Sequence, residues 1–427
     1  MNICIAGAGY VGLTTAAVLA ELGHKVRCVD LDQRKIDALN DGTVPIYEPG
    51  LEELVARHRL GGTLSFGTDV MAGIAGHELV MIAVGTPPAE DGSADLSHVR
   101  NVLLDICSEI GDRKTIVIKS TVPPGTGDWA ESFMLENGVP ADRFDVVSNP
   151  EFLREGTALH DSFHPDRIVI GASNAEAAGR VRELYNGIEA PVLVTGRTDA
   201  ELIKYGSNAF LAVKLSFVNE LARACEAFGA DIVKVAEGVG MDGRIGGKFL
   251  QAGIGYGGSC LPKDVSALIG AASVRGIDME LLRSAERVNA TQPDVYVAKL
   301  EQSIGPLSPV SVIAVWGASF KENTDDIRES QAIALIGRLR RTGCAVQAFD
   351  PLVSPRIEGV AWRGSALEAA EGADALVIAT GWRQFVESDW KEVKARMRGI
   401  TILDGRNVLD RRMVEQAGLR YAGVGRP

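Results

Sequence analysis

Cysteine and histidine are scarce in this sequence, and long apolar runs are missing. The 427 residues hold six cysteines and six histidines, without the spacing of a metal site. His160 and His164 are four residues apart, but their proline-containing, loop-like surroundings argue against a metal pair. No apolar run approaches the ~18–20 residues that cross a bilayer, and no basic, apolar leader precedes the first strand. We therefore expect a cytoplasmic protein with reduced cysteines, no metal and no membrane partner.

Positive charge is also in short supply. Lysine and arginine number 44 against 56 aspartates and glutamates, which gives a formal net charge of −12. This balance argues against nucleic acid or an anionic membrane as the main partner. An anionic nucleotide substrate would need a local group of basic residues. The length allows two or three domains, and a hydrophobic content of 46% is typical of a globular protein.

A glycine-rich stretch follows the first apolar run. Residues 2–6 predict a strand, Gly7-Ala8-Gly9-Tyr10-Val11-Gly12 follows, and an Ala/Leu-rich helix continues to about Leu22. Residues 25–29 predict the next strand, and Asp30 closes it. This order predicts an NAD-binding Rossmann unit, in which Asp30 accepts from the ribose hydroxyls and would repel the 2′-phosphate of NADP. The alternative is a glycine-rich turn without a ligand.

Polar residues follow three later strands. Thr86 follows the strand predicted at 79–84, and Thr121 follows the one predicted at 116–119. Glu151 and Glu155 come after a strand that ends near Ser148. Ligands of open α/β sheets bind at the carboxyl ends of the strands, so these residues are candidates for a site. By their spacing alone, the two glutamates could equally lie on an exposed helix face.

A long helix is predicted at residues 199–228, which contain no proline and have apolar residues at helical spacing. It would be roughly 45 Å long. Lys204 and Asn208 are four residues apart and share one face, where a cation and an amide could stabilise an oxyanion. The alternative is a lysine whose stem packs on the helix and whose amine reaches water, beside a surface asparagine.

The stretch from Gly255 to Asp264 predicts a reactive thiol. Glycines at 255, 257 and 258 let the backbone approach a ligand, and Pro262 suits the first turn of a helix. Cys260 would then lie at a helix N-terminus, which favours a thiolate, with Lys263 and Asp264 nearby. We interpret Cys260 as a candidate nucleophile. The alternative is a buried cysteine that packs as a small apolar side chain.

The last third predicts a second doubly wound sheet after the boundary at Pro306-Leu307-Ser308-Pro309. Apolar strands are expected at 310–315, 345–349 and 373–379, and the turn at 317–321 lacks GxGxxG, so we expect no second dinucleotide. The predicted fold is α/β, with two Rossmann-like doubly wound domains joined by a long central helix with a small α-helical domain. The predicted boundaries are 1–198, 199–305 and 306–427.

Several stretches resemble the UDP-glucose/GDP-mannose dehydrogenase family. They are GYGGSCLPKD at 255–264, SNPEFLREG at 148–156, DAELIKYGSNAF at 199–210 and the run at 31–54 after the first acidic residue. Residues 322 and 323 are Glu-Asn, where a Lys-Pro pair is common in the family. The match extends from the N-terminus to about residue 330.

The resemblance, together with the patterns above, implies three sets of site residues. The catalytic set is Cys260, Lys204, Asn208, Asp264, Glu151 and Thr121. The cofactor-binding set is Gly7, Gly9, Tyr10, Val11, Gly12, Asp30, Lys35, Thr86, Thr121, Glu155, Lys263 and Arg328. The substrate-binding set is Phe152, Leu153, Arg154, Glu155, Lys204, Asn208, Arg244, Phe249, Leu250, Gly257, Phe320 and Lys321.

The implied reaction is the four-electron oxidation of the C6 alcohol of UDP-glucose to UDP-glucuronate, with NAD as cofactor and a thiohemiacetal and a thioester on Cys260. Arg244-Ile245-Gly246 resembles the family's UDP-glucose branch, in which this arginine reaches the neighbouring subunit's substrate and implies a homodimer. An exposed loop arginine is the alternative. Oxidation of UDP-N-acetylhexosamine or GDP-mannose, a two-electron dehydrogenase of the hydroxyacid type and a protein that senses NAD without turnover stay open.

Overall fold

The computed structural model describes residues 1–89 and 92–426, which form two compact units. Unit 1 comprises residues 1–207 with 266–277, and unit 2 comprises residues 208–265 with the chain from 278 onward. Helices α9 (Arg197–Phe228) and α11 (Leu261–Ser273) each contribute residues to both units. Each unit is described separately below.

Unit 1 is built on an open sheet whose described residues form eight strands in the order β3-β2-β1-β4-β5-β6-β7-β8. All neighbouring strands are parallel except β6 and β7, which are antiparallel. The beginning of β7 therefore lies at the edge of the sheet where β6 ends. The strands are β1 (Asn2–Ala6), β2 (Lys25–Val29), β3 (Leu64–Gly67), β4 (Leu79–Ile82), β5 (Lys114–Ile118), β6 (Phe144–Ser148), β7 (Ile168–Ala172) and β8 (Val192–Thr195).

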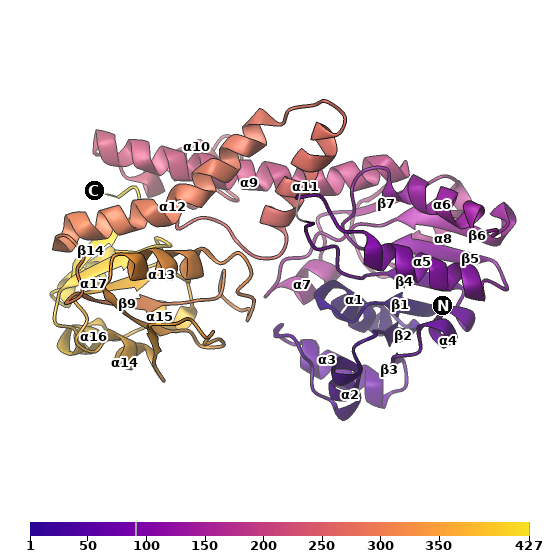
Figure 1. Cartoon of the computed structure of the whole chain (residues 1–427), viewed down its shortest axis with the longest axis horizontal. Helices are drawn as coiled ribbons and strands as arrows, with labels where there is room; N and C mark the ends of the chain where they lie inside the picture. The colour runs from indigo at the N-terminus through magenta and orange to yellow at the C-terminus, as the bar shows by residue number, and fades with distance from the viewer. Residues whose placement is uncertain (90–91, 427) are drawn as a thin grey trace. The chain divides into compact units, whose positions relative to one another are not determined.

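Helices cover the sheet of unit 1 (Figure 1). Asp32 and Asp69 begin two of them by accepting backbone N–H groups of the first turn. The helices are α1 (Tyr10–Glu21), α2 (Gln33–Asp41), α3 (Leu51–Leu60), α4 (Val70–Ala75), α5 (Ser97–Glu109), α6 (Thr126–Glu136), α7 (Ala158–Phe163), α8 (Ala175–Glu183) and the short 3-10 helix η1 (Ala141–Arg143).

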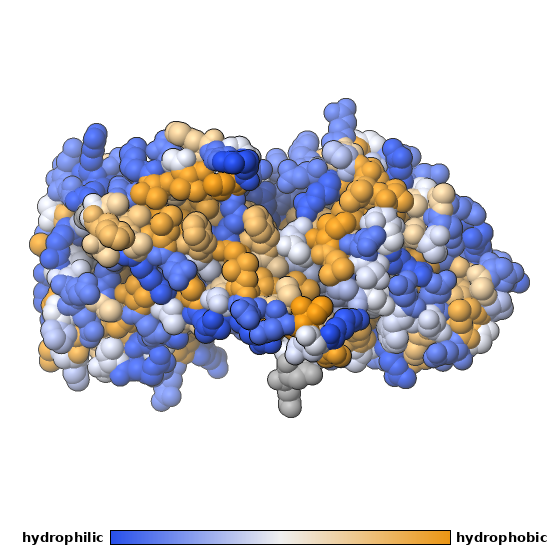
Figure 2. Space-filling view, turned by 90° about the horizontal axis from the view of Figure 1, so that it is seen from above, coloured by the Kyte–Doolittle hydropathy of each residue, from blue (hydrophilic) through white to orange (hydrophobic). Residues whose placement is uncertain are grey.

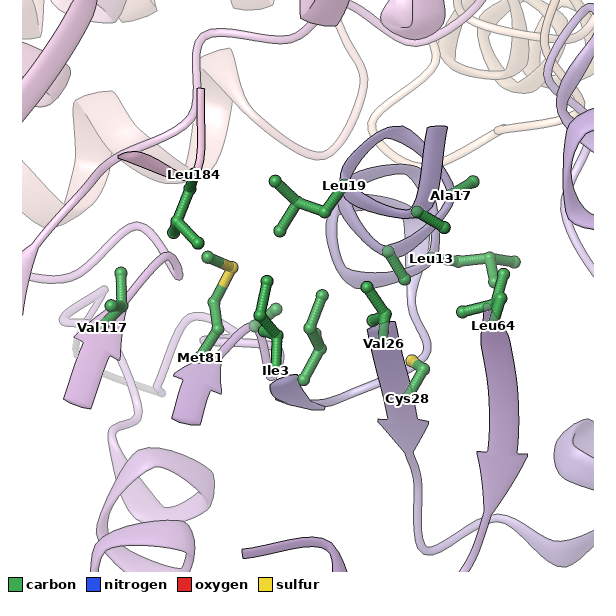
Figure 3. Packing of buried hydrophobic residues seen from close by; sticks show 14 of the residues in the cluster. Ile3, Leu13, Ala17, Leu19, Val26, Cys28, Leu64, Met81, Val117 and Leu184 are labelled. Atoms are coloured by element: carbon green, nitrogen blue, oxygen red, sulfur yellow. The ribbon is translucent and has the colours of Figure 1, made fainter. Parts of the chain in front are cut away.

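One of the two buried clusters of unit 1 lies between α1 and the strands, and the other packs α4, α5 and α6 against the strands. Figure 3 shows side chains of α1 packed over side chains of β1 to β5 and Leu184; the labelled residues are Ile3, Leu13, Ala17, Leu19, Val26, Cys28, Leu64, Met81, Val117 and Leu184. A helix packed this closely on its sheet holds the turn between β1 and α1 in one place.

Unit 2 repeats the doubly wound arrangement. The described strands are all parallel and follow the order β11-β10-β9-β12-β13-β14. They are β9 (Val312–Trp316), β10 (Ala345–Phe349), β11 (Val360–Trp362), β12 (Ala375–Ile378), β13 (Thr401–Asp404) and β14 (Arg420–Gly423). The helices, besides α9 and α11, are α10 (Ile232–Gly240), α12 (Glu280–Ile304), α13 (Gln331–Arg341), α14 (Ala366–Ala370), α15 (Arg383–Val386), α16 (Trp390–Arg396) and α17 (Arg411–Gln416).

The predicted fold class, with two Rossmann-like sheets and a long central helix, is confirmed. Helix α9 begins two residues earlier than predicted, at Arg197. Helix α13 begins at Gln331, because the hydroxyl of Ser330 accepts the N–H of Ile333 and caps the helix there. In residues 1–89 and 92–426, no helix combines the length and apolar character needed to cross a bilayer.

The two glycines of the first turn predict opposite effects on stability. A Cβ atom on Gly12 would lie 1.9 Å from the carbonyl oxygen of Gly7, whereas a Cβ atom on Gly9 would meet nothing within 4 Å. We expect Gly12→Ala to destabilise the protein by about 2–3 kcal/mol, because the packed turn must shift. Thermal unfolding without ligands measures this change, and Gly9→Ala, which is expected to keep the wild-type melting temperature, is the matched control. Equal melting temperatures for the two variants would contradict the close packing at Gly12.

Candidate active site

The turn between β1 and α1 is closed on its protein side and open at Gly9. Gly7 has a φ of +107°, and a Cβ atom there would lie 2.6 Å from the carbonyl oxygen of Ala83. Gly9 has open space where its Cβ atom would point. A phosphate can therefore approach the backbone at Gly9 and the N-terminus of α1, so the turn fits the pyrophosphate of a dinucleotide.

Asp30 lies at the end of β2 beside this turn. Its Oδ2 accepts from the backbone N–H of Ala8 and from Lys35 Nζ, both at 2.8 Å. Its Oδ1 accepts from the N–H of Asp32 at 3.0 Å. Partial burial alone would raise the pKa of Asp30, but the bonds from Lys35 and the two amides lower it below its usual value. The predicted ribose acceptor is therefore a carboxylate, next to the predicted cofactor residue Lys35.

The equivalent turn in unit 2 has the buried Ser319 in the place of Gly9. Gly317, with a φ of +106°, corresponds to Gly7, and a Cβ atom there would lie 2.4 Å from the side chain of Thr380. The Oδ2 of Asp350, at the end of β10, already accepts from the N–H of Ala318, the N–H and hydroxyl of Ser319, and the indole N–H of Trp382. Asp350 thus has a structural role and differs from Asp30.

Two predicted threonines meet at the ends of β4 and β5. The hydroxyl of Thr86 donates to the carbonyl oxygen of Thr121 at 2.8 Å. The hydroxyl of Ser120 donates to the carbonyl oxygen of Val84 at 2.6 Å. These bonds tie the loop after β4 to the loop after β5. They fix the backbone around Thr121 at the carboxyl edge of the sheet.

Glu151 and Lys204 form a buried ion pair. Lys204 Nζ, from α9, lies 2.9 Å from Glu151 Oε1, and the two side chains are 3% and 4% exposed. Glu151 Oε2 accepts from the N–H of Leu153 at 2.5 Å. Burial alone would raise the pKa of Glu151, but the charge and hydrogen bond of Lys204 lower it below its usual value. Glu151 is therefore held as a carboxylate with a fixed orientation.

In the residues that follow Glu151, the Phe152 ring lies close to two cations. The Lys204 ammonium lies 5.4 Å from the centre of the Phe152 ring and the Arg167 guanidinium 3.7 Å from it. Arg154 is turned toward Asp161, with its Nε 2.9 Å from Oδ2, and Glu155 is buried. The sequence analysis did not single out Arg167; its place follows from the antiparallel β7, which begins where β6 ends.

Cys260 immediately precedes α11. Its Sγ lies 3.6 Å from the hydroxyl of Ser259, and its carbonyl oxygen accepts the N–H of Asp264 at 2.9 Å. Asp264, 1% exposed, accepts from Asn208 Nδ2 at 2.6 Å and from Lys263 Nζ at 2.7 Å. The structure of unit 2 thus brings the carboxylate that follows the thiol by one turn together with the predicted amide and the predicted lysine.

The glycine loop before Cys260 is closely packed. A Cβ atom on Gly257 would lie 2.2 Å from the carbonyl oxygen of Glu329, and one on Gly258 would lie 2.7 Å from the ring of Phe320. Buried Asn289 accepts the N–H of Tyr256 at 2.8 Å and donates to its carbonyl oxygen at 2.9 Å. A side chain at either glycine would clash with these neighbours, so the packing of this loop requires glycine at both positions.

Arg406 also holds this loop, and the sequence analysis missed it. Its guanidinium donates to the carbonyl oxygens of Ala379, Gly255 and Phe320, at 2.8, 3.2 and 2.8 Å. Burial lowers the pKa of Arg406 from its usual value. No local pattern marks Arg406, since it follows β13 and is distant in sequence from the loop it supports.

The other predicted residues of unit 2 have varied surroundings. The Arg244 side chain is 89% exposed and pairs with Asp242, and Arg328 pairs with Asp326. Leu250 belongs to the core, whereas Phe249 is half-buried. The backbone of Phe249 has a positive φ of +63°, and that of Asn323 has a φ of +60°. Lys321 Nζ lies 5.7 Å from the ring centre of Phe320.

The φ of Asn323 explains the departure from the family's Lys-Pro pair. Proline is fixed near a φ of about −65° and cannot adopt a positive value, whereas asparagine tolerates it. Elsewhere, no group of three or more histidines, cysteines, aspartates or glutamates among the described residues could hold a metal ion.

Comparisons with known proteins cover nearly the whole chain. Residues 1–189 match the NAD binding domain of the UDP-glucose/GDP-mannose dehydrogenase family, residues 198–291 its central domain and residues 314–411 its UDP binding domain. UDP-glucose 6-dehydrogenase of Rhizobium meliloti (strain 1021) is 44% identical, with 100% of both chains covered.

Two solved structures are also similar. A UDP-glucose dehydrogenase from the hyperthermophilic archaeon Pyrobaculum islandicum has a TM-score of 0.92 and 38% identity, covering 100% of this chain and 98% of that one. A UDP-D-ManNAc dehydrogenase from Pyrococcus horikoshii has a TM-score of 0.89 and 29% identity, covering 100% and 99%. The chain therefore belongs to the UDP-glucose/GDP-mannose dehydrogenase family and is an NAD-dependent oxidoreductase.

Proposed function

We propose that this enzyme oxidises the C6 alcohol of UDP-glucose to UDP-glucuronate through a covalent intermediate on Cys260. The observation that carries the proposal is the placement of Cys260 at the start of α11, after a closely packed glycine loop and one turn before the buried Asp264. The UDP-glucose activity printed for the relatives supports the choice of sugar. We further propose that residues 1–198, 199–305 and 306–427 serve as NAD-binding, central and UDP-sugar-binding domains of a cytoplasmic enzyme.

Bound NAD⁺ would accept a hydride from C6 in each of two oxidations, and the turn at Gly9 with Asp30 would hold it. In unit 1, we assign the orientation of the substrate hydroxyl and its proton transfer to Glu151 with Thr121. Lys204 compensates the Glu151 carboxylate and would stabilise negative charge on the C6 oxygen. Proton transfer by Glu151 uses a carboxylate whose pKa is lowered, and charge stabilisation by Lys204 uses an ammonium that is excluded from water.

Cys260 captures the aldehyde left by the first oxidation. Its thiolate would add to C6, forming a carbon–sulfur bond as the carbonyl π bond breaks, and the resulting alkoxide would take one proton, from water or an acidic group, to become the hydroxyl of a thiohemiacetal. The second oxidation leaves a thioester. Water then adds, the carbon–sulfur bond breaks, and the thiol is regenerated with release of the acid. Asn208 would stabilise the oxyanion, and Asp264 would orient the water or take its proton.

Phe320, Lys321 and Phe249 are proposed to bind the UDP moiety, by stacking on the base and by charge on the phosphates. The cation over Phe320 supports this assignment. Rates with UDP-glucose, UDP-N-acetylhexosamine and GDP-mannose test the choice of substrate; a preference for either of the last two would contradict it.

The thiol assignment predicts a loss of acid production in Cys260→Ser. A serine hydroxyl is un-ionised and a much weaker nucleophile at neutral pH, so we expect UDP-glucuronate formation to fall at least about 100-fold. Chromatographic analysis of the product measures the rate. Cys107→Ser, which changes a half-buried thiol of α5, is the control and should keep the wild-type rate. Unaltered acid formation in Cys260→Ser would contradict the proposal.

We also propose that the enzyme is a homodimer formed through unit 2. Apolar side chains that a monomer would expose lie on helices of this unit or directly after them: Phe210 and Phe217 of α9, Val233 of α10, Met241 immediately after α10, and Leu281 of α12. Figure 2 shows a band of apolar surface over this part of unit 2. The neighbouring, exposed Arg244 would then reach the partner's substrate, as the family resemblance implies.

The dimer predicts a mass shift in Phe217→Asp. Light scattering of the wild type should give about twice the chain mass of 45.4 kDa, and the variant should shift toward 45.4 kDa, because the new charge opposes burial of this face. Leu60→Asp, at an exposed leucine of unit 1, is the control. A monomeric wild type, or an unchanged dimer in Phe217→Asp, would contradict the proposed interface.

A further inference from the structure

Glu48 is a buried carboxylate to which neither the sequence patterns nor the reaction assigns a role. It lies just before α3 and is 5% exposed. Its Oε1 accepts the N–H groups of Ala158 at 2.7 Å and Leu159 at 3.4 Å, and its Oε2 accepts the N–H of Gly156 at 2.6 Å. Both oxygens thus fix the turn that ends the segment beginning at Glu151.

Tyr10 connects this carboxylate to the dinucleotide turn. Tyr10 follows Gly9 and is the first residue of α1, and its hydroxyl donates to Glu48 Oε2. The same hydroxyl accepts the N–H of Gly156 at 2.9 Å. Burial and the neighbouring Glu48 raise the pKa of the phenol, so it stays a donor at any physiological pH. Gly156, Glu48 and Tyr10 therefore form one closed set of hydrogen bonds.

The hydrogen bonds among Tyr10, Glu48 and Gly156 join two parts of unit 1 with different proposed roles, one in NAD binding and one in proton transfer. One end is the glycine turn, where NAD phosphates meet the N-terminus of α1. The other end is the chain from Glu151 to Gly156, in which Glu151 Oε2 accepts from the N–H of Leu153. Gly156 has a φ of +79°, which its contacts with Glu48 and Tyr10 hold in place.

We propose that Tyr10 and Glu48 are positioning residues that couple NAD binding at the glycine turn to ordering of residues 151–159. Phosphates bound at the glycine turn restrict the remaining motion of the first turn of α1 and, with it, that of the Tyr10 hydroxyl. That hydroxyl and Glu48 then hold the backbone of Gly156 to Leu159. The coupling rests on the NAD site and on contacts within unit 1, and it needs neither the sugar nor Cys260.

Amide hydrogen exchange of the complete protein, with and without saturating NAD⁺, tests this coupling. In the wild type, NAD⁺ should slow exchange in a peptide covering 151–159 at least about fivefold, the lower end of ordinary coupling between two sites. In Tyr10→Phe, the glycine-turn peptide should still be protected by NAD⁺, while protection of 151–159 is lost. Tyr47→Phe, which removes the same group from the adjacent exposed tyrosine, is the matched control and should behave as the wild type.

Two results would overturn the proposal: NAD⁺ leaves the 151–159 peptide of the wild type unprotected, or Tyr10→Phe keeps full protection there. If the Tyr10 hydroxyl had only a structural role, its removal would speed exchange equally with and without NAD⁺. The ratio of the two exchange rates would then be the same as in the wild type. In Glu48→Gln, NAD⁺ should likewise fail to slow exchange in the 151–159 peptide. Glu52→Gln, on the exposed face of α3, is its control and should behave as the wild type. Because no sugar is present, failure of this experiment leaves the proposed oxidation of UDP-glucose untouched.

Discussion

Hydrogen bonding of two buried carboxylates by residues of α9 is the constraint on which the candidate site depends. Lys204 neutralises Glu151 in unit 1, and Asn208 donates to Asp264 in unit 2, whose charge is paired with Lys263. A buried carboxylate without such a partner would protonate or destabilise the fold. The two partners are one helical turn apart, so a change in the course of α9 would disturb both acids.

The two sheets share a strand order but differ in what their turns admit. Gly9 leaves open space beside a charged Asp30, whereas the equivalent position in unit 2 is the buried Ser319, which donates to Asp350 together with Trp382. Of these two positions, the one in unit 1 has the open space that a phosphate needs. Unit 2 instead supports the loop before Cys260 with buried amides and with Arg406.

Most of the fold could be predicted from local sequence, because apolar strands and the glycine turn are short-range signals. The catalytic candidates came mainly from family motifs, since spacing alone left Glu151 and Lys204 ambiguous. Arg167, Arg406 and Glu48 could not be predicted. Arg167 is placed by the reversal of β7, Arg406 by a contact across about 150 residues, and Glu48 by a fold that returns residue 156 to it. Such placements depend on topology, which residue patterns do not specify.

The central claim is that a thiol retains the half-oxidised sugar so that one active site completes both oxidations. A dehydrogenase of the hydroxyacid type shares the NAD fold but stops after two electrons. The most direct measurement is the amount of NADH formed per UDP-glucose consumed at complete conversion, by absorbance and chromatography on the same sample. The account predicts two NADH for each UDP-glucuronate released; one NADH for each sugar, with an aldehyde as product, would contradict it.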